Sequence, residues 1–372
     1  MSPTDRSAPP EVGGGSGARE AVRTLNPGYF ALVMATGIVS IAMQSHQIYA
    51  VSVVLLWLSG IEYAVLVGAY TWRLAAFRAA VLADLSDPAR AFAYFTFVAA
   101  TDVLGARLAV DGYHIAALVL LAVGWVAWLA LGYVVPWAAV LGRARRPVLQ
   151  YANGTWFIWV VASQSVAVLA ATLEPEVGTG RRELALLAVF SWSVGVFLYA
   201  AAGIFVAARL LVYDLRPVDL TPQYWVSMGA TAITVVAGAR IVDMADAPMV
   251  TATRVLIAGA SVVFWAFGSW LIPALVAAGV WRHVVHHVPL RYEAPLWSIV
   301  FPLGMYGVAG DSLGQADQLP LVAAIGADES WVALVAWLLT FLAMLRHLVR
   351  TVLPTGTPWH GAAGAVRDGD LR

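Results

Sequence analysis

A short apolar segment recurs five times along this chain. In the first copy, NPGYFALVMATGIVSIAM at residues 26–43, an aromatic residue precedes an Ala–Thr pair by five positions. The later copies are AYFTFVAATDVLGAR, GTWFIWVVASQSVAV, PQYWVSMGATAITVV and APLWSIVFPLGMYGV. The aromatic residues of the five copies are, in chain order, Phe30, Phe95, Phe157, Trp225 and Trp297. The period is roughly 60 to 70 residues, which is long enough for two membrane crossings.

The composition places most of the chain in lipid. It has 372 residues, of which 61% are hydrophobic and only 12% are charged, whereas a soluble domain carries about 25% charged residues. The formal net charge is zero, so no basic field indicates nucleic acid as a partner. The chain has no cysteine, which excludes disulfides, thiolate metal sites and a cysteine nucleophile. We expect no cofactor and no metal.

Ten segments are apolar over the roughly 20 residues that a crossing helix needs. We expect a disordered cytoplasmic tail at 1–25, rich in Gly, Ser, Pro and Ala, a transmembrane domain at 26–353, and a cytoplasmic C-terminal tail at 354–372. The predicted spans are 27–45, 51–72, 91–109, 113–137, 152–172, 184–208, 223–242, 254–280, 294–314 and 331–353.

Orientation follows from arginine, because all 22 basic residues are Arg. With the N-terminus inside, the cytoplasmic segments hold 17 of them and the outer loops hold five. The positive-inside rule then predicts a multi-pass protein of the plasma membrane with both termini in the cytoplasm.

The five repeats coincide with the odd-numbered spans, which are rich in small and hydroxyl residues. The even-numbered spans are rich in Leu, Val and Trp. Small residues favour helix–helix contacts in a bilayer, and bulky apolar residues suit a lipid-facing surface. The prediction is an all-α integral membrane fold of ten helices. Five helical hairpins stand in a quasi-fivefold arrangement, with the odd helices around a central pore.

The position four residues after each aromatic lies on nearly the same helix face. It holds Met34, Ala99, Val161, Gly229 and Phe301. Phe301 is the only bulky ring in this set, and it precedes Pro302, which can kink the helix. Two interpretations are open: Phe301 and Pro302 form a gate across the axis, or Phe301 packs against a neighbouring helix.

The position six residues after each aromatic carries a hydroxyl in four of the five repeats. These residues are Thr36, Thr101, Ser163 and Thr231, and Leu303 takes the fifth place. One interpretation is a pore-lining ring that donates O–H groups to an anion. The other is that each hydroxyl bonds the carbonyl four residues back.

Few ionisable residues lie inside the predicted spans. Glu62 and Asp102 are the carboxyl candidates for carrying a proton, because charged groups inside a membrane are costly unless they have a partner or a role. The alternative is a structural ion pair of either carboxylate with Arg107, Arg240 or Arg254. Arg107 and Arg240 lie near the outer ends of their helices, where they could also attract anions.

Three histidines, His283, His286 and His287, form an H-x-x-H-H cluster in a predicted cytoplasmic loop. The cluster lacks the glutamate of the H-E-x-x-H zinc motif, and Glu293 is the nearest carboxylate after it. Catalysis by a membrane enzyme with this cluster is therefore the least favoured function, and we expect no enzyme.

The chain resembles the tellurite-resistance/C4-dicarboxylate transporter family, which includes fungal malate and sulfite transporters and plant slow-type anion channels. The resemblance covers about residues 26–353 and rests on NPGYFALVMATGIVSIA, NGTWFIWVVASQS, TPQYWVSMGATAIT and WSIVFP. It implies ten helices around a central pore, usually in a homotrimer, and a pore-blocking phenylalanine at Phe301. Leu303 departs from the hydroxyl pattern, so a complete polar ring is not expected.

The predicted function is transport of a small anion, either a C4-dicarboxylate or an inorganic oxyanion such as tellurite or sulfite. The alternative is a passive channel for chloride or nitrate. Protons are the candidate coupling ion, because the resembled family contains both channels and proton-coupled carriers.

Overall fold

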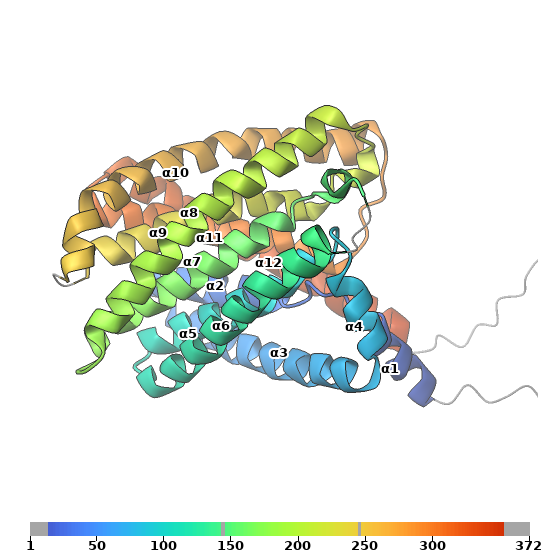
Figure 1. Cartoon of the computed structure of the whole chain (residues 1–372), viewed down its shortest axis with the longest axis horizontal. Coiled ribbons are helices and arrows are strands. Elements are labelled where there is room, and N and C mark those ends of the chain that lie inside the picture. Colours follow the sequence, from blue (N-terminus) through green and yellow to red (C-terminus); the bar gives the residue numbers. More distant parts are fainter. Residues whose placement is uncertain (1–13, 143–145, 245–246, 353–372) are drawn as a thin grey trace, which may run out of the picture.

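The computed structural model describes residues 14–142, 146–244 and 247–352. Every regular element in these ranges is a helix (Figure 1). The helices are α1 (Gly14–Arg23), α2 (Ala31–Ser45), α3 (Tyr49–Ala76), α4 (Arg78–Leu85), α5 (Thr96–Val110), α6 (His114–Val135), α7 (Trp156–Leu173), α8 (Arg181–Val212), α9 (Val226–Val242), α10 (Pro248–Val280), α11 (Trp297–Ala316) and α12 (Pro320–Val352).

Short turns of tighter or wider helix extend several of these elements. Single 3₁₀ turns lead directly into α5, α9 and α11, at Ala91–Phe95, Pro222–Trp225 and Ala294–Leu296. Two π-helical turns, Pro136–Leu141 and Trp281–Val285, continue α6 and α10. The aromatic residue of each repeat lies within one residue of the start of its α-helix.

Eight helical stretches in the described part of the chain are long and apolar enough to cross a membrane. The remaining two predicted spans correspond to α2, which has only 15 residues, and to α11, which has 20. The protein is thus an all-helical membrane protein.

The segment 1–25, which was predicted to be a disordered tail, contains the helix α1. The carbonyl oxygen at the end of α1, on Arg23, accepts a 3.2 Å hydrogen bond from Nε of Arg73 on α3. The guanidinium of Arg19 lies 5.4 Å from the ring centroid of Phe77. The predicted tails at 1–13 and 354–372 lie outside the described residues.

The last connection is shorter than predicted. The predicted spans left residues 315–330 between the last two crossings, but α11 runs to Ala316 and α12 already starts at Pro320. Proline suits the first helical position, because its missing N–H has no partner there in any case. The backbones of Gly310 and Gly326 also pack against each other, so the two helices approach closely.

Each repeat helix packs along the helix that follows it, giving the pairs α2–α3, α5–α6, α7–α8, α9–α10 and α11–α12. The repeat helices also contact one another in a closed cycle, α2–α5–α7–α9–α11–α2. Burial separates the two sets. In the most apolar windows of α5, α7 and α9, 78% to 83% of residues are buried, against 17% to 28% in α3, α6, α8, α10 and α12. Figure 1 shows α3 and α10 along opposite edges of the bundle.

Candidate functional site

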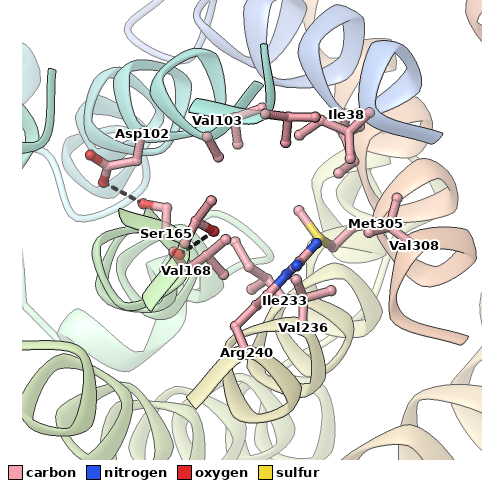
Figure 2. Close-up of a pocket in the computed structure, with 14 residues that line it drawn as sticks. Ile38, Asp102, Val103, Ser165, Val168, Ile233, Val236, Arg240, Met305 and Val308 are labelled. Carbon is pink, nitrogen blue, oxygen red and sulfur yellow. Dashed lines mark hydrogen bonds between the residues drawn. The ribbon is translucent and has the colours of Figure 1, made fainter. Parts of the chain in front are cut away.

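A small cavity of about 40 Å³ lies inside the cycle of repeat helices (Figure 2). All of its lining residues come from α2, α5, α7, α9 and α11. One residue from each helix occupies the same repeat position, eight residues after the aromatic: Ile38, Val103, Ser165, Ile233 and Met305. The internal repeat therefore produces a common lining position, two helical turns into each helix.

Most of the cavity wall is apolar. Its polar lining residues are Asp102, Ser165, Thr172 and Arg240, and the others are Ile, Val, Ala and Met. One carboxyl group and one guanidinium thus share a space with few other polar groups. Charges interact more strongly in such surroundings than in water.

A wider vestibule of about 420 Å³ adjoins this cavity. Val110, Thr172 and Arg240 line both spaces. The vestibule also holds Asp243 and a contact between His114 and Glu176, with 3.6 Å between Nε2 and Oε2. The central cavity is therefore next to a polar opening, and the junction lies at Arg240.

Arg240 has an exposed side chain. It forms no hydrogen bond or ion pair with any residue in the described ranges. Figure 2 shows the side chain extending from α9 toward Met305 on α11. An unpaired guanidinium at the end of an apolar cavity can attract an anion and donate up to five hydrogen bonds to it.

Asp102 lies on the opposite side of the cavity from Arg240 in Figure 2, and its side chain is turned toward Ser165. The residue is 1% exposed. Its Oδ2 accepts a 2.8 Å hydrogen bond from the Ser165 hydroxyl. Its Oδ1 is buried and has no hydrogen-bond partner among the described residues.

The predicted ion pair of Asp102 with Arg107 or Arg240 is not formed. Arg107 is oriented toward α2 and α3, where it donates to the hydroxyls of Ser40 at 2.9 Å and Ser52 at 3.0 Å. Its ionic partner is Asp111. The reason is helical geometry, since Asp111 follows Arg107 by four residues and shares its face, whereas Asp102 precedes it by five.

Arg107 is therefore part of a structural polar cluster and not of the cavity lining. Arg254, the third predicted partner, donates instead to the carbonyl oxygens of Val242 at 2.7 Å and Met244 at 3.1 Å. These carbonyls are at the C-terminal end of α9, where arginine commonly caps a helix.

The four repeat hydroxyls, which were predicted to line a pore, are not among the residues that line this cavity. Trp337 of α12 donates to Thr36 at 3.0 Å, and Trp128 of α6 donates to Ser163 at 2.8 Å. Thr101 bonds the hydroxyl of Tyr63 on α3 at 3.0 Å.

The fourth repeat hydroxyl also faces an outer helix, because Thr231 packs against Gly268 of α10. The physical reason is rotation along the helix. The hydroxyl position precedes the lining position by two residues, which is about 200°, so the two positions lie on opposite faces. The alternative, a bond to the carbonyl four residues back, holds for Thr101 and Ser163. Their hydroxyls donate to the carbonyl oxygens of Phe97 at 2.7 Å and Trp159 at 3.2 Å.

Phe301 is 1% exposed and lies one helical turn before Met305, which lines the cavity. Phe301 itself is not a lining residue. The adjacent Pro302 packs against Gly229 of α9, at a distance that leaves no room for a side chain on that glycine. The cavity thus ends near the level of Phe301.

Glu62 on α3 lies apart from the cavity. It is 8% exposed, and neither carboxylate oxygen has a hydrogen-bond partner among the described residues. The Thr36 hydroxyl of α2 lies near this carboxyl group. Glu62 therefore lies between the repeat helices and the outer helices.

The histidine cluster shows ordinary local contacts. Nδ1 of His283 lies 2.8 Å from the Val288 carbonyl oxygen, and Nδ1 of His286 lies 3.1 Å from that of Trp281. In the part of the chain that the structure describes, no group of three or more His, Cys, Asp or Glu side chains is arranged to hold a metal ion.

Sequence reasoning missed Ser165 and the lining set of Ile38, Val103, Ile233 and Met305. The internal repeat contains the signal that could have predicted these residues, because all five lie eight positions after the aromatic residue of their repeat. The hydroxyl residues six positions after each aromatic favoured a different helix face, because polar side chains are typical of an anion pathway.

A membrane-embedded cycle of repeat helices, with a cavity inside it and an arginine at its opening, defines a membrane transport protein. Over residues 24–345 the chain matches the voltage-dependent anion channel family, and it belongs to that family. This confirms the resemblance to the tellurite-resistance/C4-dicarboxylate transporter family.

Individual relatives agree with this assignment. An uncharacterized membrane protein of Mycobacterium tuberculosis is 65% identical over 173 residues, which cover 46% of this chain and 87% of that protein. An uncharacterized transporter of Methanocaldococcus jannaschii is 24% identical over 330 residues, covering 87% of this chain and 93% of its own. A second transporter of that organism is 22% identical over 334 residues, covering 88% and 96%. The family consists of transporters and channels, so the chain is a membrane protein of anion transport.

Proposed function

We propose that this protein carries small anions across the membrane along the axis of the α2–α5–α7–α9–α11 cycle. The substrate is a C4-dicarboxylate or an inorganic oxyanion such as tellurite or sulfite. The observation that carries the proposal is the position of Arg240, an unpaired guanidinium at the junction of the vestibule and the central cavity.

The architecture proposed for this activity has ten transmembrane helices in a quasi-fivefold arrangement. The closed contact cycle and the pairing of each repeat helix with its successor support it. The short helix α2 fits, because the turn that leads into it, 27–30, is also buried or half-buried. Interior helices can be shorter than lipid-facing ones where neighbouring helices satisfy the backbone.

Phe301 is the proposed gate. Support comes from its place one turn below the cavity and from its burial at the level where the cavity ends. Pro302 next to it contacts α9 at Gly229, so movement of α11 at this point would be transmitted to α9. Removal of the ring would extend the cavity toward the other side of the membrane.

The proposal also covers the membrane in which the protein lies and the orientation of its termini. We place the protein in the plasma membrane with both termini in the cytoplasm, on the basis of the arginine distribution. The outer helices carry large exposed apolar residues, Trp57, Phe197, Val255 and Trp270 among them. Such surfaces suit lipid or further copies of the chain in a homotrimer. Light scattering of the purified protein in detergent would measure the number of copies.

The experiment that tests the function is anion flux in proteoliposomes. Malate, succinate, sulfite, tellurite, nitrate and chloride would be compared, each with and without a pH gradient. Uptake of dicarboxylate or oxyanion above that of protein-free vesicles supports the proposal. Flux of chloride and nitrate alone would favour a passive channel, and the absence of any anion flux, including in a Phe301→Ala variant, would refute transport.

A further inference from the structure

The central cavity contains a buried carboxyl group whose partners come from three different helices. Asp102 is on α5, its hydrogen-bond donor Ser165 is on α7, and its Oδ1 is held against the backbone of α6 at Gly124. A side chain on Gly124 would occupy the space that Oδ1 now fills. The carboxyl group is therefore seated in a niche at the margin of the cavity and not on its axis.

The Ser165 hydroxyl has two acceptors within reach. Its oxygen lies 2.8 Å from Oδ2 of Asp102 and 2.9 Å from the carbonyl oxygen of Ala162. A hydroxyl has one proton to donate and can also accept. If Asp102 is a carboxylate, Ser165 donates to it. If Asp102 is protonated, Asp102 donates to the Ser165 oxygen and Ser165 donates to Ala162.

Both protonation states thus have a complete hydrogen bond between Asp102 and Ser165 without any movement of the helices. An ion pair would instead favour the charged state alone. The charged and titratable groups around the niche are few. Arg240 faces the same cavity from α9, and Tyr63 of α3 bonds the neighbouring Thr101. The remaining ones on α6 and α5 are His114, Tyr133 and Arg107, with Asp111 directly after α5. The helix α3, which also packs against α5, adds Tyr49, Glu62, Tyr70 and Arg73, while α2 and α7 have none.

We propose that Asp102 and Ser165 form a proton-binding site on the anion pathway, and that the charge on Asp102 decides whether an anion can enter the cavity. The inference rests on the proposed transport function. A proton from the vestibule binds Oδ2, the carboxylate charge disappears, and only the positive charge of Arg240 remains in the cavity. When the proton returns to the vestibule, the carboxylate again repels anions. Gly124 is a positioning residue, because it keeps the carboxyl group off the axis.

The test is anion flux over a pH series in proteoliposomes. Wild-type flux should rise as the pH falls. Asp102→Asn should give high flux that no longer depends on pH, with a gain over wild type at high pH of about tenfold or more from the loss of one unit charge. Ser165→Ala removes the one hydrogen-bond donor that the carboxylate has among the described residues, so the midpoint of the flux curve should move to higher pH. An unchanged pH profile in Asp102→Asn would overturn the inference.

Gly124→Ala tests the niche. Its methyl group should displace the carboxyl group toward the axis and lower the flux at high pH, where Asp102 is charged. The control is Gly132→Ala on the same helix, where an added methyl group would meet only Trp159 at 3.9 Å. Equal flux in the two glycine variants would argue against a positioning role, since both add one methyl group to α6.

An infrared measurement separates failure of this inference from failure of the transport function. Difference spectra between high and low pH should contain the carbonyl band of a protonated carboxyl group. This band should be lost in Asp102→Asn, shifted in Ser165→Ala and retained in Glu62→Gln. A band lost only in Glu62→Gln would exclude Asp102 as the proton site, whatever the flux data show.

Discussion

Arg107 and Asp111 form an ion pair at the C-terminal end of α5, with 2.7 Å between Nη1 and Oδ1. The Arg107 side chain is fully buried, whereas that of Asp111 is 24% exposed. The contact is close but poorly aligned for a hydrogen bond. Arg107 also bonds Ser40, Ser52 and Gln44, so one guanidinium ties α5 to α2 and α3. Its positive charge is satisfied there, and Asp102 is left without an ionic partner.

Asp111→Asn should therefore destabilise the protein without abolishing flux. The variant leaves the buried Arg107 charge without its counterion. Because Asp111 is partly exposed, we expect a loss of about 1–3 kcal/mol, less than the ~3–5 kcal/mol for a fully buried pair. Thermal unfolding in detergent would measure this, with the exposed Asp214→Asn as control. Equal unfolding temperatures in the two variants would contradict a structural role for the pair.

Phe301→Ala should raise anion flux, because the ring lies at the end of the central cavity. Removing a buried ring also costs about 3–5 kcal/mol of stability, so protein yield and unfolding temperature must be measured beside flux. Phe301→Trp should keep the pathway closed. Phe190→Ala, at a residue of the outer helix α8 that is 53% exposed, should change neither quantity. A folded Phe301→Ala protein with wild-type flux would refute the gate.

Cysteine scanning can map which helix faces line the pathway, since the chain has no cysteine of its own. Ile38→Cys and Ile233→Cys lie at lining positions and should be blocked by silver ions, which are small thiol reagents. Thr36→Cys and Thr231→Cys face the outer helices and should keep their flux in silver. Leu338→Cys on α12 is the lipid-side control. Block at the threonine positions instead would restore the hydroxyl ring as the lining.

Arg240→Gln should lower anion flux by about tenfold at low ionic strength, because it removes the cation at the junction of cavity and vestibule. The difference should shrink as salt is added, since salt screens charges beyond roughly 10 Å at 0.1 M. Arg240→Lys keeps the charge and should retain most of the flux. If all three proteins carried anions equally at every ionic strength, Arg240 would have no part in recruitment.

Composition and periodicity were sufficient to predict the general plan of this protein. The apolar content required a helical membrane protein, and the five-fold repeat separated the buried helices from the exposed ones. Apolar content and the repeat are both local properties of the sequence. A membrane helix forms its backbone hydrogen bonds within itself, so its side chains alone indicate whether it faces lipid or other helices. The short N-terminal helix α1 and the short connection before α12 were missed. Each depends on packing against another helix, which no local pattern contains.

Which face of each repeat helix turns inward was decided by the tertiary structure. Thr36 and Ile38 lie two residues apart on one apolar helix, and both faces are buried, so hydropathy cannot distinguish them. Only the neighbours do so: Trp337 offers an N–H group to Thr36 from outside, and the cavity meets Ile38 from inside. Asp102 is a similar case. The sequence placed it in the membrane, but the choice between an arginine and Ser165 depended on how α5 is rotated against α7.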